Sequence, residues 1–257
     1  MRGCGSRTSS PVYDDLGLYV EVPAAVSRVV SLVPSLTESV AATAPGLLVG
    51  ATDWCSHPAD LDVARVKGTK SPDLEAVLDL RPDLVLANAE ENRIEDLDAL
   101  RAAGVAVWVT YPRTVPEALA SLDRMLSACR LDRPTWLAEA DAVWSEPFVG
   151  TRRRGLVPIW RRPWMAVGSG TFTGDVLSRL GVDNVLGNHP ERYPKVDLGT
   201  LAAYDVVVLP DEPYAFTPTD GPECFSVPSI CVSGRYLTWY GPSLVAARAE
   251  LAAALSS

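Results

Sequence analysis

The sequence is short of histidine and of positive charge. Only 2 histidines occur in 257 residues, and 23 Lys and Arg residues stand against 32 Asp and Glu residues, which gives a formal net charge of −9. With so few imidazoles, and without paired thiols, a structural zinc site is not expected. A nucleic-acid partner is not expected either, because no surplus of Lys and Arg is present to neutralise phosphates.

Cysteine pairs and long apolar runs are also lacking. The 5 cysteines form no Cys-x-x-Cys pair, and their odd number leaves at least one unpaired. We favour scattered free thiols, with a Cys224–Cys231 bridge as the alternative. No apolar run reaches the roughly 18 residues that a membrane span needs, so no transmembrane segment is expected.

The first residues are compatible with two locations. Met1-Arg2-Gly3-Cys4-Gly5-Ser6 lacks the apolar stretch of an export signal, so the chain as it stands is expected to remain in the cytoplasm. However, Gly3-Cys4-Gly5-Ser6 looks like the end of a lipoprotein cleavage site. If the true start lies upstream of Cys4, we expect an extracytoplasmic lipoprotein instead.

Catalytic and nucleotide-binding motifs are missing as well. Gly168-Ser169-Gly170 is not a nucleophile elbow, which needs Gly-x-Ser-x-Gly between a strand and a helix. The sequence has no phosphate-binding GxxxxGK[ST] motif and no dinucleotide-binding GxGxxG motif. We therefore expect no catalytic residues and interpret the chain as a binding protein, not an enzyme.

What the chain does contain is an alternation of short apolar strands with helices, which is typical of parallel α/β sheets. A stretch of helix without strands, 115 to about 144, separates two such regions, so we expect two α/β lobes with separate sheets. The predicted strands cover 28–34, 47–51, 83–87, 104–110, 155–160, 165–167, 205–209 and 227–232.

These elements predict four consecutive parts. They are a polar leader over 1–23, an N-terminal α/β lobe over 24–114, a helical connector over 115–153 and a C-terminal α/β lobe over 154–257.

Two local signals predict helix starts. Ser35 and Glu38 have the spacing of a capping box, in which the serine hydroxyl accepts from the amide three residues later. In the connector, Asp132 is a plausible N-cap, and Pro134 fits the first turn of the helix that follows.

A short pattern also occurs once in each half of the chain. Asp73-Leu74-Glu75 leads through a short helix to the buried strand beginning at Asp83. Asp197-Leu198-Gly199 leads in the same way to the strand beginning at Asp205. Two similar lobes explain this echo better than one continuous sheet.

Aromatic and charged residues follow several of the predicted strands. In open α/β sheets, ligands bind outside the carboxyl ends of the strands, and flat rings there suit a large flat ligand. Packing inside a lobe is the alternative for a ring, and we expect it for Trp136, Trp144, Trp164 and Tyr236. The ligand-binding candidates are Trp54, His57, Trp160, Arg162, Glu212, Tyr214, Arg235, Trp239 and Tyr240.

Several segments, in this order, resemble the cobalamin and iron-siderophore binding proteins of ABC importers, the helical backbone metal receptors. They are 28–38, Val49-Gly50, His57-Pro58, Asp73-Leu74-Glu75 and 81–85. The second half resembles a cobalamin-binding-like branch through 159–165, Thr171-Phe172, Glu212-Pro213-Tyr214 and 238–242.

This resemblance implies two Rossmann-like lobes bridged by a single long helix, here about 134–151, with the ligand in the cleft. It also implies one glutamate per lobe that docks the importer. Glu75 matches the first, but Gly199 occupies the second position and cannot form a salt bridge, so we expect weak docking. Trp54 matches a position where the family places an aromatic ring against the corrin.

We therefore expect a monomeric, non-catalytic protein that captures cobalamin or a haem-like tetrapyrrole, typically for ABC-type import through a permease. The ligand would be cargo and not an intrinsic cofactor, and no metal site is expected in the protein itself. A ferric chelate of the siderophore type is the nearest alternative. An intracellular protein that uses the same scaffold as an enzyme or partner-binding subunit is the other.

Overall fold

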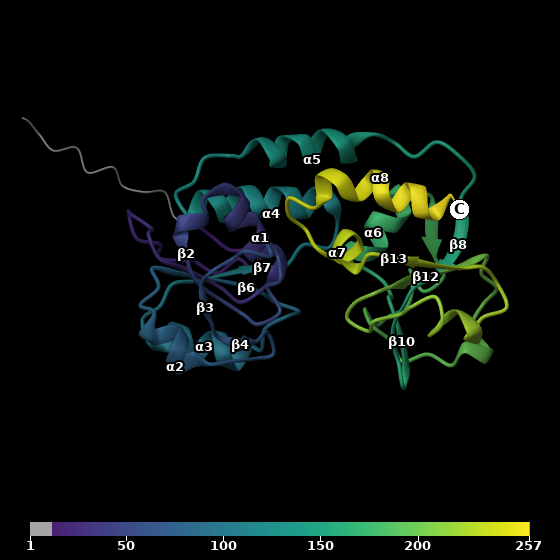
Figure 1. Ribbon diagram of the computed structural model, residues 1–257, viewed down its shortest axis with the longest axis horizontal. Helices are drawn as coiled ribbons and strands as arrows, with labels where there is room; N and C mark the ends of the chain where they lie inside the picture. The colour runs from purple at the N-terminus through teal and green to yellow at the C-terminus, as the bar shows by residue number, and fades with distance from the viewer. Residues whose placement is uncertain (1–11, 257) are drawn as a thin grey trace, which may run out of the picture. The chain divides into compact units, whose positions relative to one another are not determined.

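Short apolar runs form the strands of two separate parallel sheets, as predicted. The computed structural model describes residues 12–256 (Figure 1). These residues divide into a first unit, 12–111 with 121–133, and a second unit, 112–120 with 134–256. Each unit contains one of the two sheets.

The sheet of the first unit has five strands in the order β3-β2-β1-β6-β7, and all of its neighbouring strands are parallel. Every residue of β6 and β7 is buried, as expected for parallel strands covered on both faces of the sheet. The strands are β1 (Val29–Ser31), β2 (Leu48–Ala51), β3 (Ala64–Arg65), β6 (Leu84–Asn88) and β7 (Val107–Thr110).

Helices and one small hairpin complete the first unit. The hairpin pairs β4 (Lys67–Gly68) with β5 (Ser71–Pro72) in antiparallel fashion. The helices are α1 (Pro34–Thr43), η1 (Pro45–Leu47), α2 (Leu74–Asp79) and α3 (Ile94–Ala102).

The sheet of the second unit has four parallel strands in the order β11-β8-β12-β13. A separate antiparallel hairpin joins β9 and β10. The strands are β8 (Arg153–Leu156), β9 (Pro158–Arg161), β10 (Trp164–Ala166), β11 (Val182–Asn184), β12 (Val206–Pro210) and β13 (Ser229–Val232). The helices are α6 (Phe172–Arg179), η2 (Leu198–Thr200), η3 (Pro222–Cys224), α7 (Gly234–Thr238) and α8 (Leu244–Leu255).

The predicted helical stretch between the sheets forms α4 (Val115–Ala128) and α5 (Thr135–Ser145). The residues of α4 fall in both units, with the division after Ala120, whereas α5 falls wholly in the second unit. The single bridging helix that the resemblance implied over about 134–151 stays a prediction, and within that segment α5 ends at Ser145. No helix among residues 12–256 is long and apolar enough to cross a membrane.

Three local predictions were wrong. Helix α1 begins at Pro34 after Val33, and no side chain caps it, because proline supplies no amide proton at the first position and Ser35 is already helical. Helix α5 begins after Pro134 without a side-chain cap, so Asp132 is not its N-cap. The single strand predicted over 155–160 is divided between β8 and the hairpin strand β9.

The predicted internal echo is confirmed at its capping residues. The Asp73 carboxylate accepts from the backbone amide of Ala76, at 3.1 Å, and caps α2. The Asp197 carboxylate accepts from the amide of Gly199, at 3.0 Å, and caps η2. Each cap leads to a buried strand, β6 or β12.

The echo continues at the starts of those strands. The Asp83 carboxylate accepts from the backbone amide of Arg28, at 3.0 Å, and Asp205 accepts from that of Arg154, at 2.7 Å. In return, the Asp83 and Asp205 amides each donate to the carbonyl of the same arginine, at 2.8 Å. The same reciprocal clamp therefore fixes the register of a strand in both units.

The leader packs on the first unit over its described residues. Val20 is buried, and the amide of Asp15 donates to the carbonyl of Val109 on β7, at 3.0 Å. The described part of the predicted polar leader, residues 12–23, therefore also packs against the first unit.

Candidate ligand-binding residues

In the first unit, Trp54 and His57 lie in the loop that follows β2, at the carboxyl end of the strand. The Trp54 side chain is 68% exposed, which is unusual for the largest apolar side chain. Its indole nitrogen lies beside β4, 3.4 Å from where a Cβ atom on Gly68 would be. The His57 imidazole is half-buried and its Nδ1 atom is 3.1 Å from the Ser56 hydroxyl.

Contacts of the Cys55 and Arg65 side chains hold the loop that carries Trp54. The next residue, Cys55, is fully buried, and its sulfur lies 3.0 Å from the hydroxyl of Thr37 and 3.1 Å from that of Thr52. The Arg65 guanidinium donates to the carbonyls of Thr52 and Cys55, at 3.1 and 3.0 Å. Burial raises the pKa of the Cys55 thiol, so this cysteine is a structural anchor and not a nucleophile.

In the second unit, the hairpin β9–β10 presents Trp160 and Arg162 at its exposed end. Trp160 is 43% exposed, and its ring meets that of Tyr214 edge to face, with 5.6 Å between centroids. The Tyr214 hydroxyl in turn donates to the Asp220 carboxylate, at 2.7 Å. The structure thus brings together two predicted site residues, Trp160 and Tyr214, from segments more than fifty residues apart.

A cluster of ion pairs fastens the loop after β12 to this hairpin. Arg161 contacts the Asp220 carboxylate and lies 2.5 Å from Glu223. Its guanidinium also sits over the Trp164 ring, 5.9 Å from the centroid. The Gly221 amide and the Arg161 guanidinium keep the pKa of Glu223 below its usual range. The sequence predictions did not include this contact, because nothing in the sequence around Arg161 indicates that its partners lie about sixty residues away.

Arg162 is exposed beside an open pocket of about 620 Å³. Arg161, Trp164, Asp197 and Leu198 line the same pocket. This pocket lies within the second unit, beside the η2 cap.

The remaining candidates gather at the start of α7. A Cβ atom on Gly234 would come within 2.2 Å of the Glu212 side chain, so glycine is needed there for the two loops to meet. The Arg235 guanidinium lies over the rings of Tyr236 and Trp239, at 5.7 and 6.0 Å from the centroids. This cluster therefore contains three predicted site residues, Glu212, Arg235 and Trp239.

The rings of α7 and the segment after it are much less exposed than Trp54. Trp239 is 8% and Tyr240 is 7% exposed, and Tyr240 packs edge to face on Phe172 at 5.7 Å. Of the rings expected inside a lobe, Trp144 is buried and donates to the Leu244 carbonyl, at 2.9 Å. The other three, Trp136, Trp164 and Tyr236, are half-buried.

The two positions that the resemblance associates with importer docking carry different residues. Glu75 is exposed in the first turn of α2. Gly199 is exposed in η2, and only the Asp197 carboxylate lies within 4 Å of a Cβ atom placed there. A side chain at position 199 would therefore have room to reach solvent.

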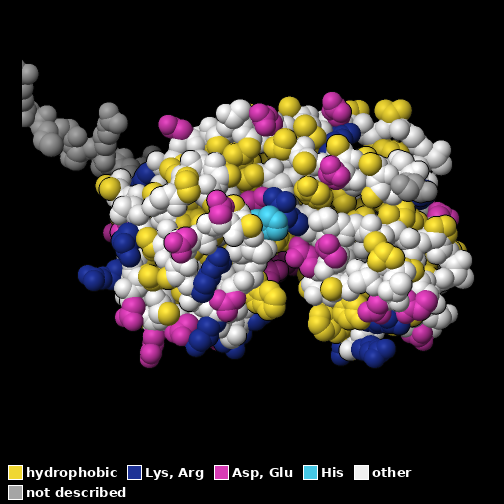
Figure 2. Space-filling model, in the orientation of Figure 1, with side chains coloured by type: hydrophobic (Ala, Val, Ile, Leu, Met, Phe, Trp, Pro, Cys, Tyr) yellow, Lys and Arg dark blue, Asp and Glu magenta, His cyan; other side chains and the backbone are white. Residues whose placement is uncertain are grey.

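Surface charge, metal-ligating groups and thiols of the described residues indicate no further site. On the face shown in Figure 2, acidic and basic side chains of the described residues are interspersed, without a continuous basic surface. Within residues 12–256, no three His, Cys, Asp or Glu side chains are grouped to hold a metal ion. Cys224 and Cys231 are free thiols, so the alternative of a bridge between them was wrong, and Cys4 lies outside the described residues.

Comparison with known proteins supports the resemblance. No family model matches the chain. The vitamin B12-binding protein of Pectobacterium carotovorum is 23% identical over 247 residues, which cover 90% of this chain and 88% of that protein. The periplasmic vitamin B12 binding protein BtuF of Vibrio cholerae has a TM-score of 0.72 at 18% identity, over 90% of this chain and 97% of BtuF. The periplasmic heme-binding protein RhuT from Roseiflexus sp. RS-1 has a TM-score of 0.70 at 18% identity, over 89% and 97%. The two-lobed α/β fold and the similarity to these receptors are confirmed.

Proposed function

We propose that this chain, which resembles the cobalamin and iron-siderophore binding proteins of ABC importers, is a non-catalytic receptor for cobalamin or a related tetrapyrrole. The observation that carries the proposal is Trp54. Its indole is 68% exposed on a loop that Cys55 and Arg65 hold fixed. Leaving so much apolar surface in water forgoes burial, and a flat ligand stacked on the ring would recover it.

The second unit supports the same ligand class. Trp160 and Tyr214 form a ring pair on the hairpin, and Arg161 is engaged by Asp220 and Glu223. With its charge already compensated, Arg161 contributes little to binding an anionic ferric chelate, which several basic residues would have to recognise. The compensated charge of Arg161 makes this hairpin a weaker site for an anionic ligand, and the ferric chelate stays the alternative. How these rings surround one ligand stays a prediction.

Import is the proposed role, and the periplasmic relatives favour an extracytoplasmic location. We propose that the receptor is a monomer and that it docks weakly on its permease. The reason is that Glu75 is exposed and able to pair with an arginine, whereas Gly199 offers no charge.

The test is an absorption titration of the full chain with cobalamin, haem and a ferric siderophore. We expect a saturable spectral change with one of the first two at one equivalent, and little change with the ferric chelate. Trp54→Ala should weaken the change, whereas Ile94→Ala, which removes a 51% exposed side chain from α3, should leave it intact. A saturable absorption change with the ferric siderophore alone would contradict the proposed ligand class and support a ferric chelate instead.

A further inference from the structure

The leader contains a turn, residues 13–19, in which the usual distribution of side chains is inverted. We call it the leader hairpin. Its two charged side chains are buried, with Asp14 5% exposed and the Asp15 side chain 7% exposed. Its large apolar side chains face water: Tyr13 is 52%, Leu16 39%, Leu18 46% and Tyr19 59% exposed. Soluble surfaces normally show the reverse, so this inversion needs a reason.

The hairpin is a defined structure and not a loose end. Tyr13 and Tyr19 pair as an antiparallel bridge, and their rings meet edge to face with 6.0 Å between centroids. One Asp14 oxygen accepts from the backbone amides of Leu16 and Leu18, both at 2.9 Å. Gly17 occupies the tip at φ +74°, a left-handed conformation that glycine adopts without strain.

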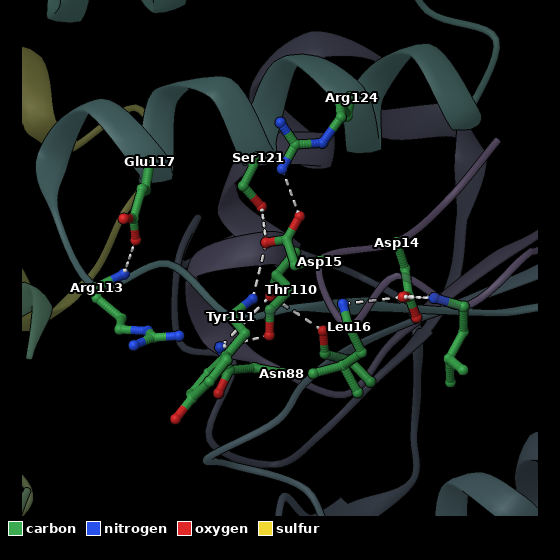
Figure 3. Close-up of polar contacts among 12 residues, drawn as sticks. Asp14, Asp15, Leu16, Asn88, Thr110, Tyr111, Arg113, Glu117, Ser121 and Arg124 are labelled. Carbon is green, nitrogen blue, oxygen red and sulfur yellow. Dashed lines mark hydrogen bonds and ion pairs between the residues drawn. The ribbon is translucent and has the colours of Figure 1, made fainter. Parts of the chain in front are cut away.

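Asp15 fastens the hairpin to the first unit, as Figure 3 shows. Its carboxylate accepts from the Tyr111 amide at 2.8 Å, the Ser121 hydroxyl at 2.5 Å and the Arg124 guanidinium at 2.7 Å. The Arg124 guanidinium compensates the negative charge of the Asp15 carboxylate, which lies beside the exposed apolar side chains of the hairpin. The hairpin is thus an apolar projection whose two acidic side chains are turned away from water.

We infer that the leader hairpin is a contact surface for a lipid bilayer, an inference that rests on the extracytoplasmic location in the proposed function. Leu16 and Leu18 are suited to enter the acyl boundary, and the two tyrosines have the amphipathic rings that favour the headgroup level. The overall negative charge of the chain makes a zwitterionic bilayer the preferred surface.

The chain that precedes the hairpin supports this surface. Cys4 stands nine residues before Tyr13, in Gly3-Cys4-Gly5-Ser6, which resembles a site of lipid attachment. Nine residues span at most about 30 Å, so an acyl group on Cys4 would keep the hairpin near the bilayer. A bilayer contact by the hairpin would add to the membrane binding that a lipid group on Cys4 supplies.

A protein partner is a poorer fit to this hairpin. A stable protein interface needs about 800 Å² from each side. Four side chains on a seven-residue turn supply much less than that. A bilayer, in contrast, has no minimum contact area when a tether already holds the protein beside it.

The test is vesicle sedimentation of the full chain acylated at Cys4. Cys224→Ser and Cys231→Ser remove the exposed competing thiols. The buried thiols react poorly, since burial raises the pKa of Cys129 to about 12 and also raises that of Cys55. Acylation with a maleimide-linked fatty chain is followed by partition into phosphatidylcholine vesicles.

We expect Leu16→Ser with Leu18→Ser to lower the partition coefficient roughly tenfold. The matched control is Leu78→Ser with Ile94→Ser, which removes two side chains that are 37% and 51% exposed on α2 and α3, and it should change partition less than about twofold. Leu18→Ser alone, an exposed single change, serves if the double variant unfolds early in a thermal scan.

Three results would overturn the inference. The first is parent-like partition of both hairpin variants, and the second is an equal loss in the control. The third is that the hairpin variants abolish a dimer seen by sedimentation velocity, which would make a second copy the partner. Ligand titration of the same variants separates this inference from the proposed function, because hairpin changes should leave the spectral response to ligand unaltered.

Discussion

The two units use the same backbone devices but expose different side chains. In each, an aspartate caps a short helix, and a second aspartate clamps the start of the following buried strand to an arginine. The first unit nevertheless exposes Trp54, whereas the second buries Trp239. In the second unit, an ion pair between Arg161 and Asp220 also joins the β9–β10 hairpin to the loop after β12. The repeated devices fix the strands, whereas the loops after the strands expose different side chains in the two units.

A second difference lies on the capped helices themselves. Two residues after the capping aspartate stands Glu75 in the first unit and Gly199 in the second. Both units keep the capping aspartate, but only the first carries an acidic side chain two residues later.

The first prediction concerns the least exposed site ring. Trp239→Ala should lower the free energy of unfolding of the second unit by about 3–5 kcal/mol, because it empties a buried position. Thermal unfolding of the variant measures this. Trp160→Ala, on the 43% exposed ring, is the matched control and should cost much less. If Trp239→Ala melts with the parent chain, its ring is not part of the second core.

The second prediction makes the docking positions alike. Gly199→Glu should increase stimulation of a cobalamin importer, since a desolvated arginine that lacks its acidic partner costs roughly 2–5 kcal/mol. Open space around position 199 accommodates the side chain. ATP hydrolysis by the importer in liposomes is the readout, with Glu75→Gln as the converse variant. Strong stimulation by the unmodified chain would contradict weak docking.

The third prediction concerns the exposed ring of the first unit. Trp54→Ala should weaken ligand affinity by about 1.5–2.5 kcal/mol, a loss of roughly ten- to seventyfold, through lost apolar contact. Its stability should change by less than about 0.5 kcal/mol, because the ring is 68% exposed. Ligand titration and thermal unfolding of the same variant check both parts. Early unfolding with unchanged affinity would reverse the roles of Trp54 and Trp239.

The fourth prediction compares the two caps. Asp73→Ala should cost about 1 kcal/mol in the first unit, because it leaves a six-residue helix uncapped and removes an ion pair of 2.8 Å with Lys67. Asp197→Ala should lower the free energy of unfolding by only about 0.3 kcal/mol, because η2 has three residues and its cap holds little helix. Urea unfolding of both variants is the measurement, and equal losses would show that the two caps are equivalent.

The fifth prediction concerns pH. Hydrogen bonds from the Ser27 amide and hydroxyl, and from the Arg28 amide, hold the pKa of Asp83 below its usual value of 3.8. The folded state therefore favours the carboxylate, and its contribution is present at neutral pH and is lost as the pH falls through that lowered pKa. Asp83→Asn should cost up to about 1 kcal/mol at pH 7, since exposure screens the carboxylate. Urea titrations at neutral and acidic pH should show the difference shrinking.

Much of the fold was predictable because it depends on local periodicity. The buried strands β6 and β12, the helical stretch between the sheets and the paired caps all follow from runs of a few residues. The capping box failed because Pro34, one residue earlier, already starts the helix. A local sequence pattern does not distinguish between two possible first residues of a helix that lie within one turn of each other.

The site was less predictable because exposure depends on distant neighbours. Trp54 and Trp239 both follow strands, yet one is exposed and the other is buried. The partners of Arg161 and the burial of Asp15 are likewise set by segments far away in the chain. Sequence patterns therefore identified the residue types and the strand ends, but not which side chains remain available to a ligand.

Equilibrium dialysis against cobalamin and haem, followed by mass spectrometry of the bound fraction, tests the central claim most directly. The proposed function predicts that the chain retains about one equivalent of one of these ligands and releases it chemically unchanged on denaturation. Retention of neither compound, or release of a modified one, would contradict a non-catalytic tetrapyrrole receptor.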